Sequence, residues 1–405
     1  MLNLRVWWCG IKTEIPKIVH LSTSRSGGAG IAANRLHQGL RQLEVNSLYF
    51  TLYRKGTFYT QTEITLKRNY ISRFVSALYA WLNRILSKKT YFTMVSTGPL
   101  KSEKLFEFGK PSEVIFHVHN WFNFITFREI EIALERGYKF VFTLHDQRLF
   151  TGGCHYSLDC LNFNSKCSKC PLLPAVVSAM PSKILGASVD FFGKFRDQIE
   201  IIAPSRWIFK QALSSSILKR NSISLIPNWH GAFALSDLKQ LSSKSSKVAK
   251  LVLGVASNDK RSNIKGLDTI FALESLIKSA KAEIEIIYLA DFQINDKQPQ
   301  LFWQEIDYLL VPSILDNSPN VIHEAKILGI PVIATDVGGI GELLNEEYDY
   351  LVDSNENTPK LIWDIIQTVT KPFSNPHKAK IKLDYQDFVA QSVEKHVEVY
   401  RRIAH

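Results

Sequence analysis

The sequence predicts an α/β protein with two domains built on parallel β-sheets, and three observations support this class. Short apolar segments rich in Val, Ile and Leu alternate with amphipathic helical segments over most of the chain, which is typical of parallel sheets. Several apolar segments end in glycines or polar residues, as strands do at the ligand-binding edge of such sheets. A chain of 405 residues is too long for one ordinary hydrophobic core, so we expect two domains.

We expect the domain boundary where the alternation of strands and helices is interrupted. Residues 231–250 are rich in Ser and Lys and have no clear periodicity, which is typical of a linker. We therefore expect a first domain over residues 1–230 and a second over residues 251–386. The helical segment 387–405 is expected to pack back on the first domain.

The composition is that of a globular protein, with 45% hydrophobic and 21% charged residues, and this excludes a disordered chain. No uninterrupted apolar segment approaches eighteen residues, and the first residues do not look like a secretory signal. We therefore predict no transmembrane helix and a cytoplasmic location. The formal net charge of +11 favours anionic partners such as nucleotide phosphates, acidic lipids or nucleic acid.

A glycine-rich turn follows the first predicted strand, residues 17–23 (KIVHLST), and opens a helix. This turn contains Gly27 and Gly28. It can be a tight turn without a ligand, or it can let backbone amides approach an anion at the positive end of the helix dipole. Its place after the first strand favours an anion site at Gly27 and Gly28.

Two further predicted strands end in histidine, at His119 and His145. One such histidine can be a structural residue of the core. Two at successive strand ends indicate a site at the edge where parallel strands end. His145, beside Asp146, is the stronger candidate.

Four of the five cysteines lie within seventeen residues, with the spacing C-x5-C-x6-C-x2-C. Four thiolates can bind a structural zinc ion in a tetrahedral site, and four reduced cysteines can also simply pack a loop. The spacing leaves both interpretations open. The residues concerned are Cys154, Cys160, Cys167 and Cys170.

Residues 69–92 form the clearest amphipathic helix of the sequence, with one apolar stripe and basic residues around it. A basic amphipathic helix with aromatic residues can lie on an anionic membrane surface. More often such a stripe packs on its own domain, and this is what we predict here.

The second half begins with a predicted strand, residues 251–257, and a loop that carries three cations. These are Lys260, Arg261 and Lys265. Cations at a strand-to-helix junction can bind a diphosphate, although a basic loop is often only solvated. Because this loop lies at the end of a strand, its position favours the interpretation as a diphosphate site.

Residues 307–342 combine a strand, a polar loop, a short helix, a second strand and a glycine turn. The polar loop carries Asp316, and Glu324 follows eight residues later on the helix. Ligands bind at the carboxyl ends of parallel strands. We therefore predict a ligand site here, with both carboxylates in or beside it.

The order of these features resembles the retaining glycosyltransferases of family 4, which have the GT-B fold of two facing Rossmann-like domains with a cleft between them. The cysteine-containing segment TGGCHYSLDC at 151–160 is similar to a branch of this family that builds bacterial exopolysaccharide or lipid-linked oligosaccharide. The segments that carry the resemblance are SGGAGIAANRL at 26–36, TLHDQRLFTGGCHYSLDC at 143–160, APSRW at 203–207, IPN at 226–228, KG at 265–266 and VPSILDNSPNVIHEAKILGIPVIATDVGG at 311–339.

The resemblance implies a role for each matching residue. Glu324 would bind the ribose of a nucleotide sugar, and Asp316 would bind the hydroxyls of the donor sugar. Lys265, aided by Arg261, would bind the donor diphosphate, and His145 would lie by the reacting sugar. The other implied donor-binding residues are Gly27, Gly28, Asn317, Ser318, Asn320 and Val321.

The implied reaction moves a sugar from a nucleotide diphosphate sugar to an acceptor hydroxyl with retention of configuration. Protein cations can do the work of a divalent metal, so we expect no catalytic metal. The expected acceptor is a glycan linked to a lipid diphosphate, reached from the inner face of the plasma membrane. We expect no nucleic-acid partner, because the cations are scattered and no reader motif is present.

Three departures from the family pattern keep a second interpretation open. Asp316 is one methylene shorter than the family's glutamate, and Val255 stands where the family has an arginine. Only about seventeen residues separate Leu289 from Asp307, where relatives have a further strand and helix. The alternative is a GT-B protein that no longer catalyses and instead binds a glycan or organises a polysaccharide assembly complex.

Overall fold

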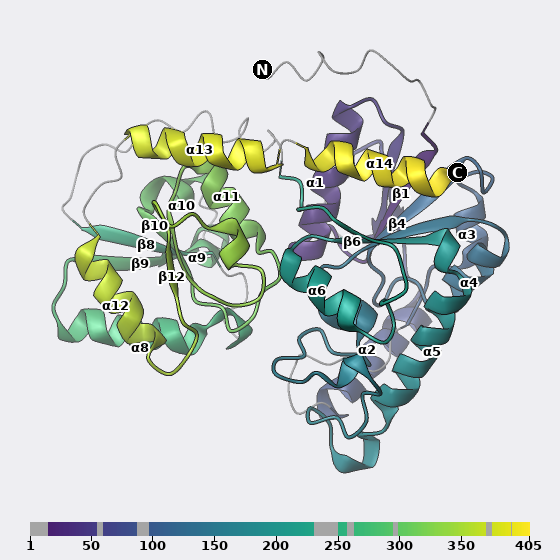
Figure 1. The fold of residues 1–405 in the computed structure, drawn as a ribbon, viewed down its shortest axis with the longest axis horizontal. Helices are drawn as coiled ribbons and strands as arrows, with labels where there is room; N and C mark the ends of the chain where they lie inside the picture. Colours follow the sequence, from purple (N-terminus) through teal and green to yellow (C-terminus); the bar gives the residue numbers. More distant parts are fainter. Residues whose placement is uncertain are drawn as a thin grey trace.

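The computed structural model describes residues 15–54, 60–86, 97–230, 250–256, 263–294, 299–369, 375–389 and 391–405. These residues form two α/β domains that lie side by side (Figure 1). Two successive helices near the C-terminus run along one side of the pair (Figure 1).

The first domain is built on a seven-stranded sheet of order β3-β2-β1-β4-β5-β6-β7. All of its neighbouring strands are parallel. Helices cover both faces, so the central strands β1 and β4 are buried on both sides (Figure 1). The strands are β1 (Lys17–Ser22), β2 (Ser47–Leu52), β3 (Glu63–Leu66), β4 (Val114–Asn120), β5 (Lys139–Thr143), β6 (Ile199–Ala203) and β7 (Ile223–Leu225).

The helices of this domain pack through the periodic apolar positions that the sequence shows. On α1, Ala33, Leu36 and Leu40 are buried against the sheet. The hydroxyl of Ser205 accepts a hydrogen bond from the amide of Ile208 and caps α6. The helices are α1 (Gly28–Gln42), α2 (Tyr70–Leu86), α3 (Ser102–Phe106), α4 (Phe127–Glu135), α5 (Met180–Lys194) and α6 (Arg206–Ser214).

The second domain has a five-stranded parallel sheet of order β12-β11-β10-β8-β9. Its strands are β8 (Leu251–Val255), β9 (Ile284–Tyr288), β10 (Tyr308–Val311), β11 (Val332–Thr335) and β12 (Tyr350–Val352). Its helices are α8 (Leu267–Ser279), α9 (Leu289–Ile294), α10 (Pro299–Glu305), α11 (Asn320–Leu328), α12 (Thr358–Thr368) and α13 (Asn375–Val389).

The last helix, α14 (Ser392–Ala404), crosses back to the first domain. Val397 and Tyr400 belong to the same buried cluster as Ile18 and Ile202. The hydroxyl of Tyr400 lies 2.7 Å from Nδ1 of His117 in β4. The C-terminus is therefore tied to the first sheet by apolar packing and a buried hydrogen bond.

Helix α2 differs from its prediction. Its large apolar side chains were expected to pack on the domain, but Ile71, Phe74 and Trp81 are exposed. The side that faces the domain carries Ser76, which is buried, and Tyr79, which is half-buried. The prediction is wrong because the most apolar arc of the helix lies beside the packed arc instead of coinciding with it. Residues 87–92 of the predicted helix lie outside the described residues.

One helical segment bears on the expectation of no membrane-crossing helix. The helical segment Ala175–Lys194 is long and apolar enough to cross a membrane by length and composition, and only 17% of it is buried. Of this segment, Met180–Lys194 is continuous α-helix. Fifteen residues give about 22 Å of helix, which is shorter than the ~30 Å hydrocarbon core of a bilayer.

Candidate active site

The carboxyl ends of β5 and β10 meet where the two domains touch. Asn317 follows β10, and its Nδ2 donates a hydrogen bond to the carbonyl of Leu144 at 2.8 Å. The hydroxyl of Ser205 donates to Oδ1 of Asn317 at 2.5 Å. Asn317 is buried. The sequence predicts Asn317 as a donor-binding residue, but in this structure its side chain joins the two domains.

The glycine pair after β11 makes this contact possible. A Cβ atom on Gly339 would lie 2.1 Å from the carbonyl oxygen of Asn317 and 2.7 Å from Cβ of Ser205. Gly338 has a φ of 61°, which favours glycine. Nearby, the carboxylate of Glu342 accepts hydrogen bonds from the amides of Arg206 and Trp207, at 2.6 and 2.7 Å. Glu342 therefore caps α6 from the other domain, at the positive end of the helix dipole.

The structure brings together Lys265 and Asp316, two of the predicted catalytic residues. They form an ion pair through Nζ and Oδ2. Lys265 ends the short turn Asn263–Lys265 after β8. Gly266 has a φ of 75°, and a Cβ there would lie 1.7 Å from the carbonyl oxygen of Pro312. This close approach holds Lys265 against the end of β10. Arg261, the predicted helper cation, lies outside the described residues.

Glu324 is paired with a residue of the other domain. Nη2 of Arg35 on α1 lies 2.6 Å from Oε1 of Glu324 on α11, and both side chains are largely buried. Arg35 was not predicted as a site residue, because the periodicity of α1 marks only its apolar face. The signal was present, since Arg35 lies in the segment of 26–36 that carries the family resemblance.

Asn320 makes a second contact between α11 and α1. Its Nδ2 donates to the carbonyl of Gly28 at 2.9 Å, and its Oδ1 lies 2.9 Å from Nε2 of His230. The first amides of a helix have no acceptor within the helix, so the N-terminus of α11 at Asn320 and Val321 offers donors to a ligand. Gly27, at the N-terminus of α1, lies on the other side of this contact.

Ser318, just before α11, contacts His323 of that helix. Its hydroxyl lies 2.9 Å from Nε2 of His323. The ring of His323 stacks on His230, with 4.0 Å between the ring centroids and 11° between the planes. Burial lowers the pKa of His323 to about 3, so this stack is neutral at pH 7. Ser318 is thereby held at the N-terminus of α11.

His145, which is half-buried, is the outer member of a row of histidines whose inner members, His119 and His20, are buried. Its Nε2 lies 3.0 Å from Nδ1 of His119, and Nε2 of His119 lies 3.0 Å from Nδ1 of His20. Burial lowers the pKa of all three, to about 4 for His145. A neutral imidazole has one donor and one acceptor nitrogen. The row therefore shares one tautomer, and that tautomer decides whether Nδ1 of His145 donates or accepts.

Three histidines of this core lie close enough to be considered as metal ligands. One ring nitrogen from each of His20, His117 and His119 lies within 4.8 Å of the others. Five of their six ring nitrogens already have hydrogen-bond partners; His117 uses Tyr400 and Thr143. The sixth, Nε2 of His20, is buried without one. We therefore interpret the group as a hydrogen-bonded core.

The predicted zinc site at the four cysteines is not supported. All four are free thiols, and within the described parts of the chain the histidine trio is the group whose ligand atoms lie close enough together to share an ion. Cys154 and Cys170 are instead hydrogen-bonded to each other. Cys167 accepts a hydrogen bond from the amide of Gly152. Cys160 is half-buried, whereas the other three cysteines are buried. The interpretation as a packed loop fits this arrangement better.

Comparisons with known proteins agree with the fold. Residues 233–371 match the family of glycosyl transferases group 1. A protein from Escherichia coli (strain K12), designated the colanic acid biosynthesis glycosyl transferase WcaC, is 23% identical over 287 residues, which cover 65% of this chain and 68% of that protein.

Solved structures are similar over nearly the whole chain. A glycosyltransferase from Rickettsia africae has a TM-score of 0.59 at 13% identity and covers 96% of this chain and 99% of its own. HepE from Anabaena, in complex with UDP and glucose, has a TM-score of 0.52 at 17% identity and covers 96% and 98%. The catalytic domain of starch synthase IV from Arabidopsis thaliana, bound to ADP and acarbose, has a TM-score of 0.59 at 12% identity and covers 96% and 99%.

The predicted GT-B fold is confirmed by the two parallel-sheet domains and these structural neighbours. The family match lies in the second domain, which carries Lys265, Asp316 and Glu324. Together these findings support a GT-B glycosyltransferase as the class of this protein. The similarity to the Escherichia coli protein designated WcaC, at 23% identity, is more specific than the family match.

Proposed function

We propose that the protein is a retaining glycosyltransferase of family 4 that uses a nucleotide diphosphate sugar as donor. The observation that carries the proposal is the Lys265–Asp316 pair at the carboxyl end of β10. One cation for a diphosphate and one carboxylate for sugar hydroxyls lie side by side there, next to the strand end that carries His145. Complexes of HepE with UDP and glucose support a nucleotide sugar as the donor.

When the donor binds, Lys265 and Asp316 separate and each takes a part of the donor as its new partner. The donor diphosphate takes over Nζ of Lys265, and the carboxylate of Asp316 is freed to accept hydrogen bonds from sugar hydroxyls. The N-termini of α1, at Gly27 and Gly28, and of α11, at Ser318 to Val321, direct their amides and their positive dipole ends at the phosphates. The carboxylate of Glu324 accepts hydrogen bonds from the ribose hydroxyls, and Arg35 holds that carboxylate in place.

The reaction requires that negative charge on the leaving diphosphate be stabilised as its bond to the sugar breaks. Lys265 supplies that stabilisation in a partly desolvated site. The acceptor oxygen forms its bond to the anomeric carbon on the face that the diphosphate leaves, and the acceptor proton passes to the departing phosphate oxygen. Because attack and departure take place on the same face, the configuration at the anomeric carbon is retained. His145, neutral at pH 7 because burial lowers its pKa to about 4, orients the sugar by a hydrogen bond.

The acceptor we propose is a glycan carried on a lipid diphosphate, in the cytoplasmic synthesis of an exopolysaccharide. The similarity to a glycosyl transferase of colanic acid biosynthesis supports this choice. The shortened segment after β9, which forms α9 and α10, lies where relatives place a further strand and helix. It is therefore the part of the second domain that we expect to select the nucleobase.

A panel of nucleotide diphosphate sugars, incubated with the protein and a lipid-linked acceptor, tests the proposal. We expect turnover with one donor and an NMR spectrum of the product with the anomeric configuration of that donor. Binding of a nucleotide sugar without turnover would favour the alternative of a non-catalytic GT-B protein. Neither binding nor turnover across the panel would refute the proposal.

A further inference from the structure

An apolar stripe is exposed along the whole of α2. Phe74 is 70% exposed and Trp81 is 57% exposed. The remaining exposed members of the stripe are Tyr70, Ile71, Leu78 and Ile85. At 3.6 residues per turn these positions fall on one arc of about 100°. Six large apolar side chains on one arc form a surface patch, and patches of this kind mark interaction sites.

The opposite side of α2 fixes the helix in this orientation. Ser76 is buried, and its hydroxyl lies 2.8 Å from that of Thr97. Val75, Tyr79 and Leu82 on the same side are half-buried. The helix is therefore held by one face, and the exposed stripe is the face that remains.

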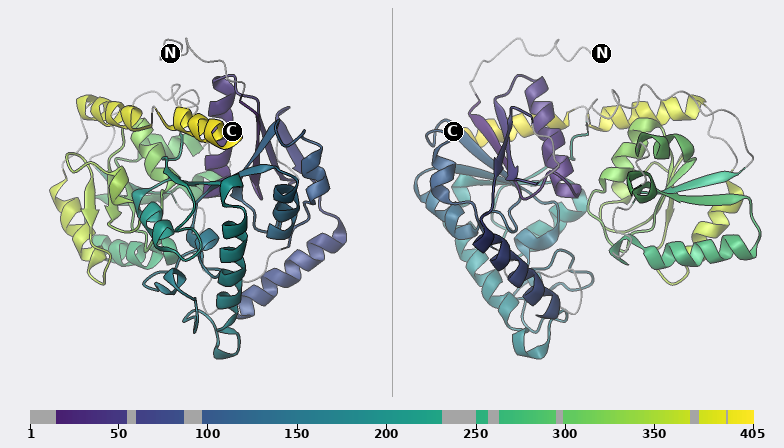
Figure 2. Two further views of the ribbon diagram at one scale, coloured as in Figure 1. Left: turned by 45° about the vertical axis from the view of Figure 1, so that its right-hand side comes forward. Right: turned by 180° about the vertical axis from the view of Figure 1, so that it is seen from behind.

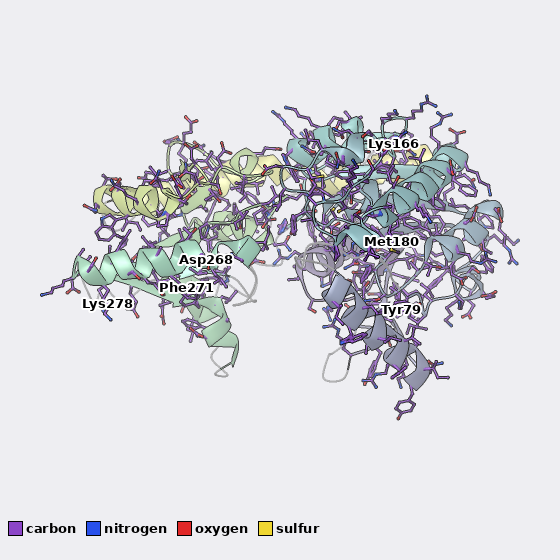
Figure 3. The ribbon with its side chains drawn as sticks, turned by 90° about the horizontal axis from the view of Figure 1, so that it is seen from below. Tyr79, Lys166, Met180, Asp268, Phe271 and Lys278 are labelled. Carbon is purple, nitrogen blue, oxygen red and sulfur yellow. The ribbon has the colours of Figure 1, made fainter. Side chains whose placement is uncertain are left out.

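A second group of exposed apolar residues lies at the same end of the first domain. Val176 and Met180 are exposed at the start of α5, and Leu161 is exposed in the loop that carries the four cysteines. The views of the ribbon show α2 and α5 extending together from this end, away from α1 and α14 (Figures 1 and 2). In the view from below, Tyr79 of α2, Met180 and Lys166 all lie on the first domain, with Met180 drawn between the other two (Figure 3). The segment Ala175–Lys194 is as apolar as a membrane helix and yet is mostly unburied.

The charges in the sequence around α2 are mainly positive. Residues 64–102 contain seven Lys and Arg residues and no Asp or Glu. Residues 160–189 contain three Lys residues, with Asp159 and Asp190 directly before and after them. Just before α2, burial lowers the pKa of Arg68, and the nearby cations Arg73 and Arg54 lower it further. Cations gathered around an apolar stripe complement an anionic surface that has an apolar interior.

We propose that the stripe of α2 and the start of α5 form a docking surface for the anionic leaflet of a lipid bilayer. The apolar side chains enter the boundary between headgroups and acyl chains, and the surrounding Lys and Arg residues contact the lipid phosphates. Helix α5 lies on the bilayer and does not cross it, because its fifteen residues are too few to span the hydrocarbon core. This inference is argued from the exposed residues and does not depend on the proposed transfer reaction.

Sedimentation with lipid vesicles tests this inference on the full chain. We expect binding to vesicles of phosphatidylcholine mixed with phosphatidylglycerol, weaker binding at high salt, and little binding to phosphatidylcholine alone. The double variant Phe74→Glu/Trp81→Glu should lower the affinity at least about tenfold. Phe271→Glu is the matched control, because Phe271 is 54% exposed on α8 of the second domain. It should bind as the unchanged protein does.

Two results would overturn the inference. One is that the unchanged protein does not bind anionic vesicles. The other is that Phe271→Glu lowers binding as much as the double variant, which would make binding non-specific. If the stripe instead joins two copies of the chain, sedimentation velocity will show a dimer that the double variant abolishes, and vesicle binding will be absent. Turnover with a soluble acceptor, measured in the same variants, separates this inference from the proposed reaction.

Discussion

Arg35 of the first domain and Glu324 of the second form an ion pair, with Nη2 and Oε1 2.6 Å apart. Each side chain is about four-fifths buried, so the pair is shielded from solvent more than a surface ion pair is. It connects α1, which follows the glycine-rich turn, to α11, which follows the loop of Asp316. The residue proposed to hold the donor ribose is thus positioned by the opposite domain.

We predict that Arg35→Leu weakens donor binding about tenfold, because the Glu324 carboxylate loses the group that orients it. Titration calorimetry with the donor measures the effect. Arg41→Leu, an exposed position on the same helix, should leave the affinity unchanged. In a double-mutant cycle with Glu324→Gln we expect a clear coupling energy. Strictly additive effects would show that the pair plays no part in donor binding.

Lys265→Ala should lower kcat/KM by about 10²-fold or more, because the leaving diphosphate loses its charge partner. Lys278→Ala is the matched control: Lys278 is an exposed lysine in the last turn of α8, which follows Lys265. Initial rates with the best donor of the panel provide the measurement. Full activity in the Lys265 variant would refute the assignment of the diphosphate-binding cation.

Gly339→Ala should open the contact between the domains. The new Cβ would meet the carbonyl oxygen of Asn317 and the side chain of Ser205, and the hydrogen bonds of Asn317 to the first domain would break. We expect a larger radius of gyration by small-angle X-ray scattering and a loss of activity. Gly186→Ala in α5 has no atom within 4 Å of its new Cβ and should change neither. An unchanged radius with full activity in the Gly339 variant would contradict this role.

The buried histidines make stability depend on pH. Burial holds the pKa of His20, His117 and His119 well below 6.5, so the unfolded chain binds protons below pH 6.5 while the folded protein does not. Stability is therefore full above pH 6.5 and falls as the pH decreases, by up to about 2 kcal/mol for each such histidine between pH 6.5 and 5. Thermal unfolding should show a markedly lower midpoint at pH 5 than at pH 7.5. Equal midpoints would mean that these histidines are already protonated in the folded protein.

Much of the fold follows from local pattern in the sequence. A buried parallel strand such as β10 is apolar along its length, and amphipathic helices such as α1 show their buried face. The short edge strands β3 and β12 (three or four residues) were not predicted, because they lack a sustained apolar run. The shortened segment after β9 was recognised by its length, whereas its two short helices were not.

The site was predictable only in part. Strand-end position and motif order indicate Lys265, Asp316 and Glu324, because these depend on neighbours in the sequence. Arg35 and the side-chain contacts of Asn317 depend on how the two domains meet, and no local pattern encodes that arrangement. The exposure of α2 was missed for the same reason. Periodicity shows that a helix has an apolar face but not what covers it.

A structure of the protein with its nucleotide diphosphate sugar tests the central claim most directly. We expect a diphosphate oxygen within hydrogen-bonding distance of Nζ of Lys265, Asp316 released from its ion pair and bound to a sugar hydroxyl, and the ribose bound to Glu324. A nucleotide bound elsewhere, such as in the basic depression of about 380 Å³ beside Arg196, Arg220 and Arg402, with the Lys265–Asp316 pair intact, would contradict it.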